Sequence, residues 1–530
     1  MTSFFTPADS ATGSALRAVT PTPPAAVPAR GRSGGAPAPK AIVIGSGFGG
    51  LAAAVRLSCK GYDVEVYEKL GAPGGRAYVW REGGYTWDAG PTIITAPFML
   101  EELWALCGKR LEDDVTLKPL DPFYRIRFDD GTHFDYSGDA DTMRAEVARI
   151  CPEDLPGYER FLVEAASCYR QGFEELGPQA FDGIGSLLKA VPALARMRGW
   201  RSLHHMVAGH IKHPKLRMVM TIHPLLIGGN PFSVTCIYSL INTLERRFGV
   251  HWAMGGTGVL VQGLVKLLAD RGAPVHLNAE VRRITVENGQ ATGIELADGT
   301  RRRADIVVSN ADTAWTYRNL VEPQHRRHWT NAKIERGDYS MSLFVWYFGT
   351  TKQFPDVPHH MMVLGPRYEG LLKDIFKHHK LAPDFSLYLH RPTATDPSMA
   401  PAGRDCFYVL APVPHLDSGT DWPAFAETFR QAVEKRLEET VMPGFGAFVE
   451  HSRVTTPQDF HDRLLSFKGA AFGLEPLLLQ SAWFRPHNRS EDVKNLFMVG
   501  ASTHPGAGVP GVLMSAKALE TVVPHAHSFN

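Results

Sequence analysis

Residues 41–50, with the sequence AIVIGSGFGG, decide the fold of this chain. The run Ala41 to Ile44 is short, apolar and rich in β-branched residues, which is typical of a buried parallel strand. A helix is expected from Leu51 to Lys60, and a second strand from Val64 to Glu68 follows after Gly61. Strand, glycine turn, helix and strand within about 30 residues form the opening unit of a dinucleotide-binding α/β fold.

The glycine turn has the spacing G-x-G-x-x-G. Gly45 permits the tight turn, Gly47 lets the backbone approach a pyrophosphate, and Gly50 lets helix and strand pack closely, while the helix N-terminus offers free N–H groups to the anion. Glu68 ends the second strand, where its carboxylate can accept hydrogen bonds from both ribose hydroxyls of an adenosine. The pattern predicts a bound nucleotide without separating FAD from NAD.

Three later segments favour a flavin. Gly74-Gly75-Arg76 combines a close backbone approach with a guanidinium that can fork onto phosphate or flavin oxygens, and Trp87 to Thr92 follows shortly after. Near the C-terminus, the strand-like Leu496 to Gly500 precedes Thr503 to Gly511, a glycine-rich turn before a helix expected near Val512. That helix N-terminus can stabilise negative charge on the pyrimidine side of a reduced flavin. A solvated surface loop and a glycine-rich linker are the structural alternatives for these segments.

Composition excludes several classes of function. The 530 residues suffice for roughly two to four units of ~150 residues, and 44% apolar residues, 21% charged residues and a net charge of +1 fit a globular protein without a nucleic-acid partner. The cysteines are scattered without a C-x-x-C pair, so we expect neither disulfides nor a metal site, and a reducing compartment. They are Cys59, Cys107, Cys151, Cys168, Cys236 and Cys406.

Residues 1–39 are dominated by Pro, Ala, Gly, Ser and Thr, which predicts a disordered tail. Three arginines and one acidic residue would also suit an organelle transit peptide, but they lack a helical apolar face. No segment has the apolar length of a membrane-spanning helix.

The cofactor signals lie at both ends of the chain and in its middle, where Ala273 to Ile284 and Ala304 to Ser309 are expected to be strands and Asp298-Gly299 a hairpin turn. We therefore predict an α/β protein whose Rossmann-type FAD-binding domain is assembled from discontinuous segments. These are 40–97, 251–312 and 494–525. Residues 98–250 and 313–493 form an inserted α+β substrate-binding and membrane-facing domain.

From Lys40 onward the sequence resembles the bacterial-type phytoene desaturases of the FAD-dependent amine-oxidase-like superfamily. The resemblance rests on the segments above and on three that are specific to carotenoid desaturases: Leu225 to Phe232, Gln480 to Asn488, and Thr503 to Gly511. The sequence departs from the family in its proline-rich tail and in Ser502, where the family commonly has glycine.

The resemblance implies FAD without a stable nicotinamide site, and stepwise dehydrogenation of phytoene through phytofluene and ζ-carotene to neurosporene and on to lycopene, with quinone or oxygen reoxidising the flavin. The cofactor-binding residues that we predict are Gly45, Gly47, Gly49, Gly50, Glu68, Lys69, Gly75, Arg76, Gly90, Pro91, Val281, Gly500, Gly508, Val509 and Pro510.

No catalytic residue is assigned. FAD accepts hydride from carbon without a charged side chain, so the protein needs a long apolar tunnel that positions the polyene and excludes water. His223, His504 and Arg485 lie in family-like motifs, but a structural hydrogen-bonding role is favoured for the motif histidines.

Phytoene is a bilayer lipid, so we expect a peripheral membrane protein on the cytoplasmic face of the cell membrane. Within Ser186 to His205, an apolar stripe faces Lys189 and Arg196, as in an interfacial helix with basic anchors. The stripe comprises Leu187, Leu188, Val191, Leu194 and Ala195. A core helix interrupted at Pro192 and Gly199 fits the same pattern.

Three other functions stay open. A related carotenoid flavoenzyme, either a desaturase of another chain or an isomerase, would share these motifs. A non-catalytic prenyl-lipid carrier of the same fold would not need the phosphate turn, Glu68, Arg76 and the C-terminal flavin loop together. A polar-amine oxidase is disfavoured by the carotenoid-type motifs.

Overall fold

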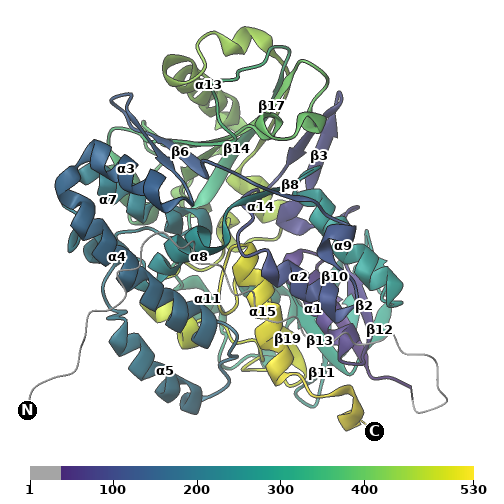
Figure 1. Cartoon of the computed structure of the whole chain (residues 1–530). Coiled ribbons are helices and arrows are strands. Elements are labelled where there is room, and N and C mark those ends of the chain that lie inside the picture. The colour runs from purple at the N-terminus through teal and green to yellow at the C-terminus, as the bar shows by residue number, and fades with distance from the viewer. Residues whose placement is uncertain (1–36, 530) are drawn as a thin grey trace, which may run out of the picture.

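The computed structural model describes residues 37–529, so most of the stretch predicted to be a disordered tail lies outside the described residues. A five-stranded sheet with its helices occupies the lower right of Figure 1, and a seven-stranded sheet occupies the upper half. The α/β class predicted from the sequence is confirmed.

The five-stranded sheet is parallel throughout. Its strands are drawn from the three segments predicted to build the FAD-binding domain, although the domain boundaries themselves stay a prediction. In spatial order the strands are β19 (Leu496–Met498), β13 (Ile306–Ser309), β1 (Lys40–Ile44), β2 (Asp63–Tyr67) and β9 (Val275–His276).

Side chains of β1 alternate between two apolar clusters, as the pleat of a strand requires. Ala41 and Val43 pack on one face and Ile42 and Ile44 on the other. The first face is covered by α1 (Phe48–Cys59), α2 (Phe98–Leu106), α9 (Thr257–Asp270) and α15 (Val509–Val522). The second is covered by an antiparallel sheet of β10 (Val281–Glu287), β11 (Gln290–Leu296) and β12 (Arg301–Arg303).

Several expected boundaries change, and β2 ends at Tyr67, so that Glu68 directly follows this strand. The first helix begins at Phe48 rather than Leu51, and α15 begins at Val509 rather than near Val512, because Pro510 fits the first turn of a helix. The prediction of one strand from Ala273 to Ile284 is wrong. The chain leaves the parallel sheet after His276, at the end of β9, and enters the antiparallel sheet at Val281, where β10 begins. The hairpin turn at Asp298-Gly299 is confirmed between β11 and β12.

The seven-stranded sheet is mixed, with one parallel pair, β15–β6. Its order is β18 (Val449–Thr455), β14 (Ser342–Thr350), β17 (Asp405–Val413), β16 (Leu387–His390), β15 (His360–Val363), β6 (Tyr124–Arg127) and β7 (His133–Tyr136). Along β14, Phe344 and Trp346 pack in the same cluster as α13 (Trp422–Thr440), whereas Leu343 and Val345 face the opposite way. Two two-stranded antiparallel sheets complete the strands: the hairpin of β3 (Val79–Glu82) and β4 (Tyr85–Asp88), and the long-range pair of β5 (Leu117–Pro119) and β8 (His251–Ala253).

Further helices cover the left side of Figure 1. They are α3 (Ala140–Ile150), α4 (Leu155–Cys168), α5 (Ile184–Arg196), α6 (Leu203–Ala208), α7 (Pro214–Thr221) and α8 (Leu240–Phe248). Shorter helices elsewhere are α10 (Thr313–Trp315), α11 (Asn331–Glu335), α12 (Tyr368–Phe376) and α14 (Pro457–Asp462). Within residues 37–529, every helix is too short or too polar to cross a bilayer.

The segment Ser186 to His205 is not one helix. It divides into α5 and α6 at a turn where Arg198 has φ +50° and the Gly199 N–H donates to the Leu194 carbonyl. Pro192 lies inside α5 without ending it.

Candidate active site

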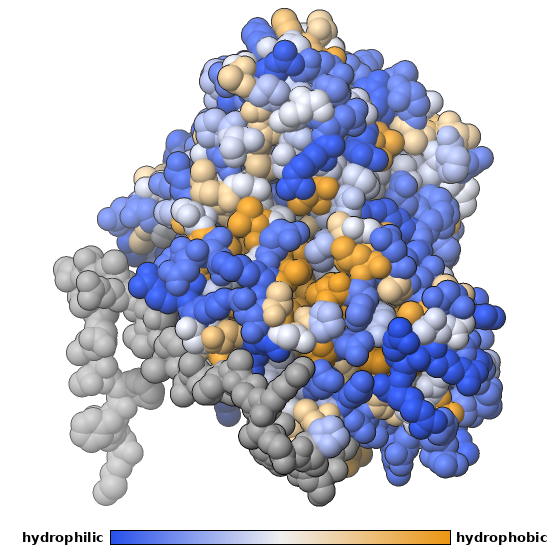
Figure 2. All heavy atoms as spheres, turned by 90° about the vertical axis from the view of Figure 1, so that its right-hand side faces the viewer, coloured by the Kyte–Doolittle hydropathy of each residue, from blue (hydrophilic) through white to orange (hydrophobic). Residues whose placement is uncertain are grey.

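A cavity of about 500 Å³ is lined by the loops that follow β1, β2 and β13 and by residues of the seven-stranded sheet. Loops at the carboxyl ends of parallel strands are the expected place for a ligand in an open α/β sheet. Figure 2 views the molecule from the side of β2, β10 and β12, and apolar residues gather in the middle of this face with polar residues around them. One wall of the cavity consists of the loops after the parallel strands, and the other includes apolar residues of the seven-stranded sheet.

The predicted phosphate turn lies at the N-terminus of α1. This helix has no side-chain cap, so its first N–H groups are available to a ligand at the cavity wall formed by Gly47, Phe48 and Gly49. A Cβ on Gly50 would lie 2.1 Å from the Gly45 carbonyl oxygen, so helix and turn meet at a distance that only glycine permits.

Glu68 is buried beside this turn. Its Oε2 accepts hydrogen bonds from the Ser46 N–H at 2.8 Å and the Ser46 hydroxyl at 2.7 Å, and its Oε1 accepts one from the Leu70 N–H at 2.9 Å. These three donors fix the carboxylate at the cavity wall, and Oε1, which accepts only one of them, keeps a lone pair for a ribose hydroxyl. That Glu68 binds ribose stays a prediction.

Asn310 was missed by the sequence reasoning. A Cβ on Gly49 or on Gly500 would lie 2.6 Å from the Asn310 Oδ1, and one on Gly47 would lie 3.1 Å from Nδ2. The Asn310 amide thus occupies the space between these three glycines and reaches the cavity wall. Its place directly after the buried strand β13 is the signal that could have identified it.

Arg76 is a half-buried cation at the cavity wall. Its Nη2 donates to the Ser466 hydroxyl at 3.0 Å, and its Nε has no hydrogen-bond partner among the described residues. Burial lowers its pKa from the usual value. A guanidinium whose buried Nε has an unused donor fits an anionic or carbonyl oxygen of a bound cofactor.

The N-terminus of α15 borders the same cavity. Gly508, before the helix, has φ +93° and supplies no side-chain cap, so the positive end of the helix dipole faces the ligand space. The Trp87–Thr92 segment is held against α9, because Asp88 Oδ2 accepts from the Thr257 N–H at 2.8 Å and the Thr257 hydroxyl donates to the Pro91 carbonyl at 2.6 Å.

Most of the predicted cofactor-binding residues line this cavity. They are Gly45, Gly47, Gly49, Glu68, Lys69, Gly75, Arg76, Gly90, Pro91, Val281, Gly508, Val509 and Pro510. Gly50 and Gly500 are outside the lining and act through the close contacts just described. The uncapped helix ends, the glycine turns and the unused Arg76 donor fit FAD, while the individual contacts stay predictions.

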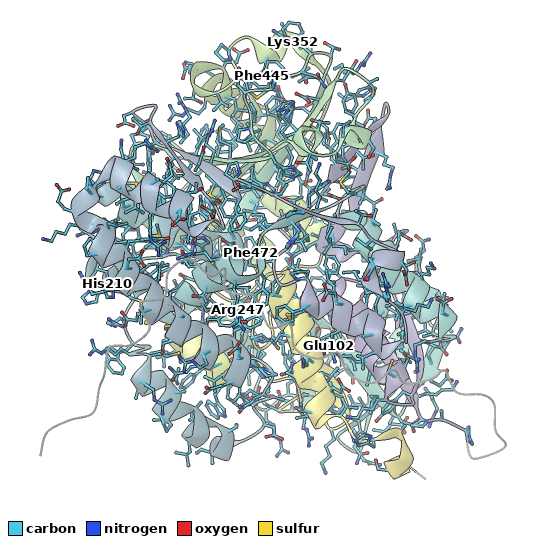
Figure 3. All side chains as sticks on the ribbon, viewed as in Figure 1. Glu102, His210, Arg247, Lys352, Phe445 and Phe472 are labelled. Atoms are coloured by element: carbon cyan, nitrogen blue, oxygen red, sulfur yellow. The ribbon has the colours of Figure 1, made fainter. Side chains whose placement is uncertain are left out.

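Much of the remaining cavity wall is apolar. Leu343 and Val345 of β14 and Met362 of β15 contribute to its wall from the seven-stranded sheet. Leu225 and Phe472 line it from other segments, and Phe472 lies near the centre of the molecule in Figure 3. This wall suits a hydrocarbon, which needs burial more than polar contacts.

The three motif residues left without a catalytic role lie outside the cavity lining. The His504 Nε2–H donates to the Leu176 carbonyl at 3.2 Å, and burial lowers the His504 pKa to about 4. Arg485 Nη2 donates to the carbonyls of Ala501 and Leu474 at 2.8 and 3.2 Å. Both residues therefore hold the chain around the C-terminal loop.

His223 lies one layer behind the cavity. Its Nε2 is 3.1 Å from Oε2 of Glu245, a buried residue that lines the cavity and accepts a 2.5 Å hydrogen bond from the Tyr124 hydroxyl. Sequence reasoning missed Glu245, because nothing in the pattern of α8 distinguishes it from a solvated charge.

Residues 48–518 match the family of flavin containing amine oxidoreductases. The chain is 50% identical over 494 residues to a neurosporene-forming phytoene desaturase of Cereibacter sphaeroides, a match that covers 92% of this chain and 95% of the relative. It is 48% identical over 484 residues to a lycopene-forming phytoene desaturase of a Paracoccus species, covering 91% and 97%.

A putrescine oxidase variant has the same fold, with a TM-score of 0.64 at 12% identity, covering 93% of this chain and 99% of that one. The family match extends over most of the residues that line the cavity and over the C-terminal loop, and the two relatives each cover more than nine-tenths of the chain. The chain is therefore a member of the flavin containing amine oxidoreductases, has FAD as its cofactor, and belongs within them to the bacterial-type phytoene desaturases.

Proposed function

We propose that this protein is an FAD-dependent phytoene desaturase that dehydrogenates phytoene stepwise through phytofluene and ζ-carotene to neurosporene and on to lycopene. The observation that carries the proposal is the continuity of the cavity, in which the wall of Gly47, Glu68 and Arg76 joins the apolar wall of Leu343 and Met362. Identities near 50% to phytoene desaturases support the substrate.

FAD, when bound, supplies the acceptor for the hydride that leaves carbon. The protein's own residues have three tasks: they align the polyene, exclude water and provide positive charge. The apolar wall aligns the polyene and excludes water, so that binding energy comes from hydrocarbon burial at ~0.8 kcal/mol per CH2 group. The α15 N-terminus and Arg76 provide fixed positive charge where an electron-rich cofactor would lie.

We expect that no single side chain is indispensable as a base. The substitutions His223→Ala and His504→Ala should therefore each leave FAD bound and desaturated products forming, because His504 serves a backbone carbonyl and His223 lies behind Glu245. Product chromatography after incubation with phytoene measures this. A variant that keeps its FAD and forms no product would identify a required base.

The proposal is tested by anaerobic incubation of the purified protein with phytoene liposomes, recording the flavin spectrum and the pigments together. Bleaching of the flavin with formation of phytofluene, the product of one two-electron step, is expected, and later addition of oxygen or a quinone should carry the products on to neurosporene or lycopene. An oxidised flavin that phytoene leaves unchanged would remove phytoene from the proposal and favour a related carotenoid flavoenzyme or an isomerase. Folded protein that cannot hold FAD supplied in excess would favour a lipid carrier and overturn the proposal.

Two further parts belong to the same proposal. A quinone or oxygen serves as electron acceptor, and the protein attaches peripherally to the cytoplasmic face of the cell membrane. Exposed apolar side chains on α5 support attachment: Ile184 is 72%, Leu188 66% and Val191 48% exposed. Trp200, 66% exposed, follows in the turn after the helix.

A further inference from the structure

Three histidines meet inside the seven-stranded sheet. His359 and His360 stand at the start of β15, and His390 ends β16, where it lies directly opposite His360 in the antiparallel register. Their exposed fractions are 6%, 1% and 1%. His390 lies 30 positions after His360 in the sequence, and the three histidines form no motif. No metal site was therefore predicted from the sequence.

The ring nitrogens have the spacing of metal ligands. Each imidazole offers one nitrogen such that all three atoms lie within 4.8 Å of one another. The Nε2 atoms of His359 and His390 are 3.2 Å apart. Two ligands of a tetrahedral zinc ion, each at ~2.0–2.1 Å from the metal, are separated by ~3.3 Å.

Outer partners leave inward-facing nitrogens for an ion. His359 Nδ1 lies 2.7 Å from the Thr395 hydroxyl, and His360 Nδ1 lies 2.7 Å from the Tyr388 hydroxyl. Metal-binding histidines commonly use their second nitrogen in this way. His360 Nε2 is buried and has no hydrogen-bond partner among the described residues, although a buried polar atom normally has one.

A buried carboxylate lies near the three rings. Asp396 supplies negative charge nearby, with its Oδ2 accepting a hydrogen bond from the Trp252 Nε1–H at 3.2 Å, and the Trp252 ring packs against His359 and His390.

We propose that His359, His360 and His390 bind one divalent transition-metal ion, with zinc as the ion that imidazole ligands and a tetrahedral spacing favour. Water completes the coordination. The ion braces the cavity wall, because Tyr388 contacts His360 on one side and the Thr92 hydroxyl, at 3.2 Å, on the other, and both Tyr388 and Thr92 line the cavity. Its role is structural and separate from the flavin chemistry.

The first experiment uses the wild-type holoenzyme. The protein is treated with a chelator, desalted, given one equivalent of Zn²⁺ and desalted again, after which elemental analysis gives zinc per chain and X-ray absorption gives the ligands. One zinc per chain with imidazole nitrogens at ~2.0–2.1 Å is expected. Protein that retains no stoichiometric zinc, or that holds it by oxygen ligands alone, would show that the three rings form only a hydrogen-bonded stack and overturn the proposal.

Variants locate the site. His359→Gln and His390→Gln should each weaken zinc binding by more than ~100-fold, since losing even an outer partner of a ligand costs ~10- to 100-fold. His415→Gln is the matched control, because His415 is also buried but lies outside the trio. FAD content reports folding of each variant. Zinc binding unchanged in folded His359→Gln and His390→Gln would exclude this site, and if either variant fails to fold, the wild-type absorption experiment decides.

Discussion

Gly50 packs its Cα against the turn that begins at Gly45, and the turn carries the N–H groups expected to bind the FAD pyrophosphate. The substitution Gly50→Ala would place a methyl group 2.1 Å from the Gly45 carbonyl oxygen, so the turn must shift. We expect a loss of about 1–3 kcal/mol of stability and a marked loss of bound FAD, measured as flavin absorbance per protein after gel filtration. Gly185→Ala, where no atom lies within 4 Å, is the control. Full FAD content in Gly50→Ala would contradict the role given to this turn.

Burial of the Glu475 carboxyl makes the stability of the folded protein depend on pH, and a single substitution can test this. Burial raises its pKa from 4.5 to about 7, and its Oε1 accepts a hydrogen bond from the Ser233 hydroxyl at 2.8 Å. A raised carboxyl pKa means that the folded state holds the proton more tightly, so stability is lost as pH rises from 4.5 through 7.

Glu475→Gln keeps the acceptor and removes the buried charge. Relative to wild type, we expect the variant to gain about 3 kcal/mol more stability at pH 8 than at pH 4.5. Urea unfolding at the two pH values measures the difference. An equal effect at both values would mean that Glu475 is not buried as a charge.

At the scale of elements, α5 presents the apolar surface that we propose to contact the membrane. The stripe expected from the sequence is only partly exposed: Leu188 and Val191 are exposed, whereas Leu187 and Leu194 are half-buried and Leu194 packs against the core. Ile184 lies outside the expected stripe and is also exposed. It belongs to α5, which begins two residues before the predicted segment.

The double substitution Ile184→Asp with Leu188→Asp should therefore reduce sedimentation of the protein with liposomes, because two exposed apolar contacts become charges. FAD content should not change. Phe425→Asp is the control, since Phe425 is exposed on α13, at the opposite end of the molecule from α5 in Figure 1. Sedimentation unchanged by the α5 substitutions would place the membrane contact elsewhere.

At the scale of the whole molecule, the active cavity is formed by walls that come from different sheets and from distant parts of the chain. Leu225 lines it, is half-buried and packs against the core cluster on the cavity side of β14. Leu225→Asp should lower kcat/KM for phytoene about 10- to 100-fold, since burying a leucine side chain contributes about 1.5–3 kcal/mol.

In that variant FAD should stay bound, because Leu225 is outside the phosphate turn. Leu225→Met preserves the apolar character and should retain most of the activity. Desaturation rates in phytoene liposomes, with flavin absorbance recorded beside them, provide the measurement. A Leu225→Asp enzyme as fast as wild type would mean that the polyene takes another path.

Features that depend on residues close together in the chain could be predicted from the amino-acid order alone. Short-range spacing predicts the turn at Gly45, the helix after it, the acid Glu68 directly after β2 and the glycine loop before α15, because backbone conformation and strand alternation are local properties. The family was predicted from the resemblance of such motifs to those of phytoene desaturases, and both the family and its cofactor FAD are confirmed.

Contacts between residues that are distant in sequence could be identified only in the folded structure. Asn310 fills the space left by Gly49 and Gly500, Glu245 meets His223, and His390 meets His359 across a sheet. The end of β9 and the exposed face of α5 were likewise set by packing. Apart from the place of Asn310 directly after β13, these contacts have no sequence signature, because the fold brings together in space residues that the chain order keeps apart.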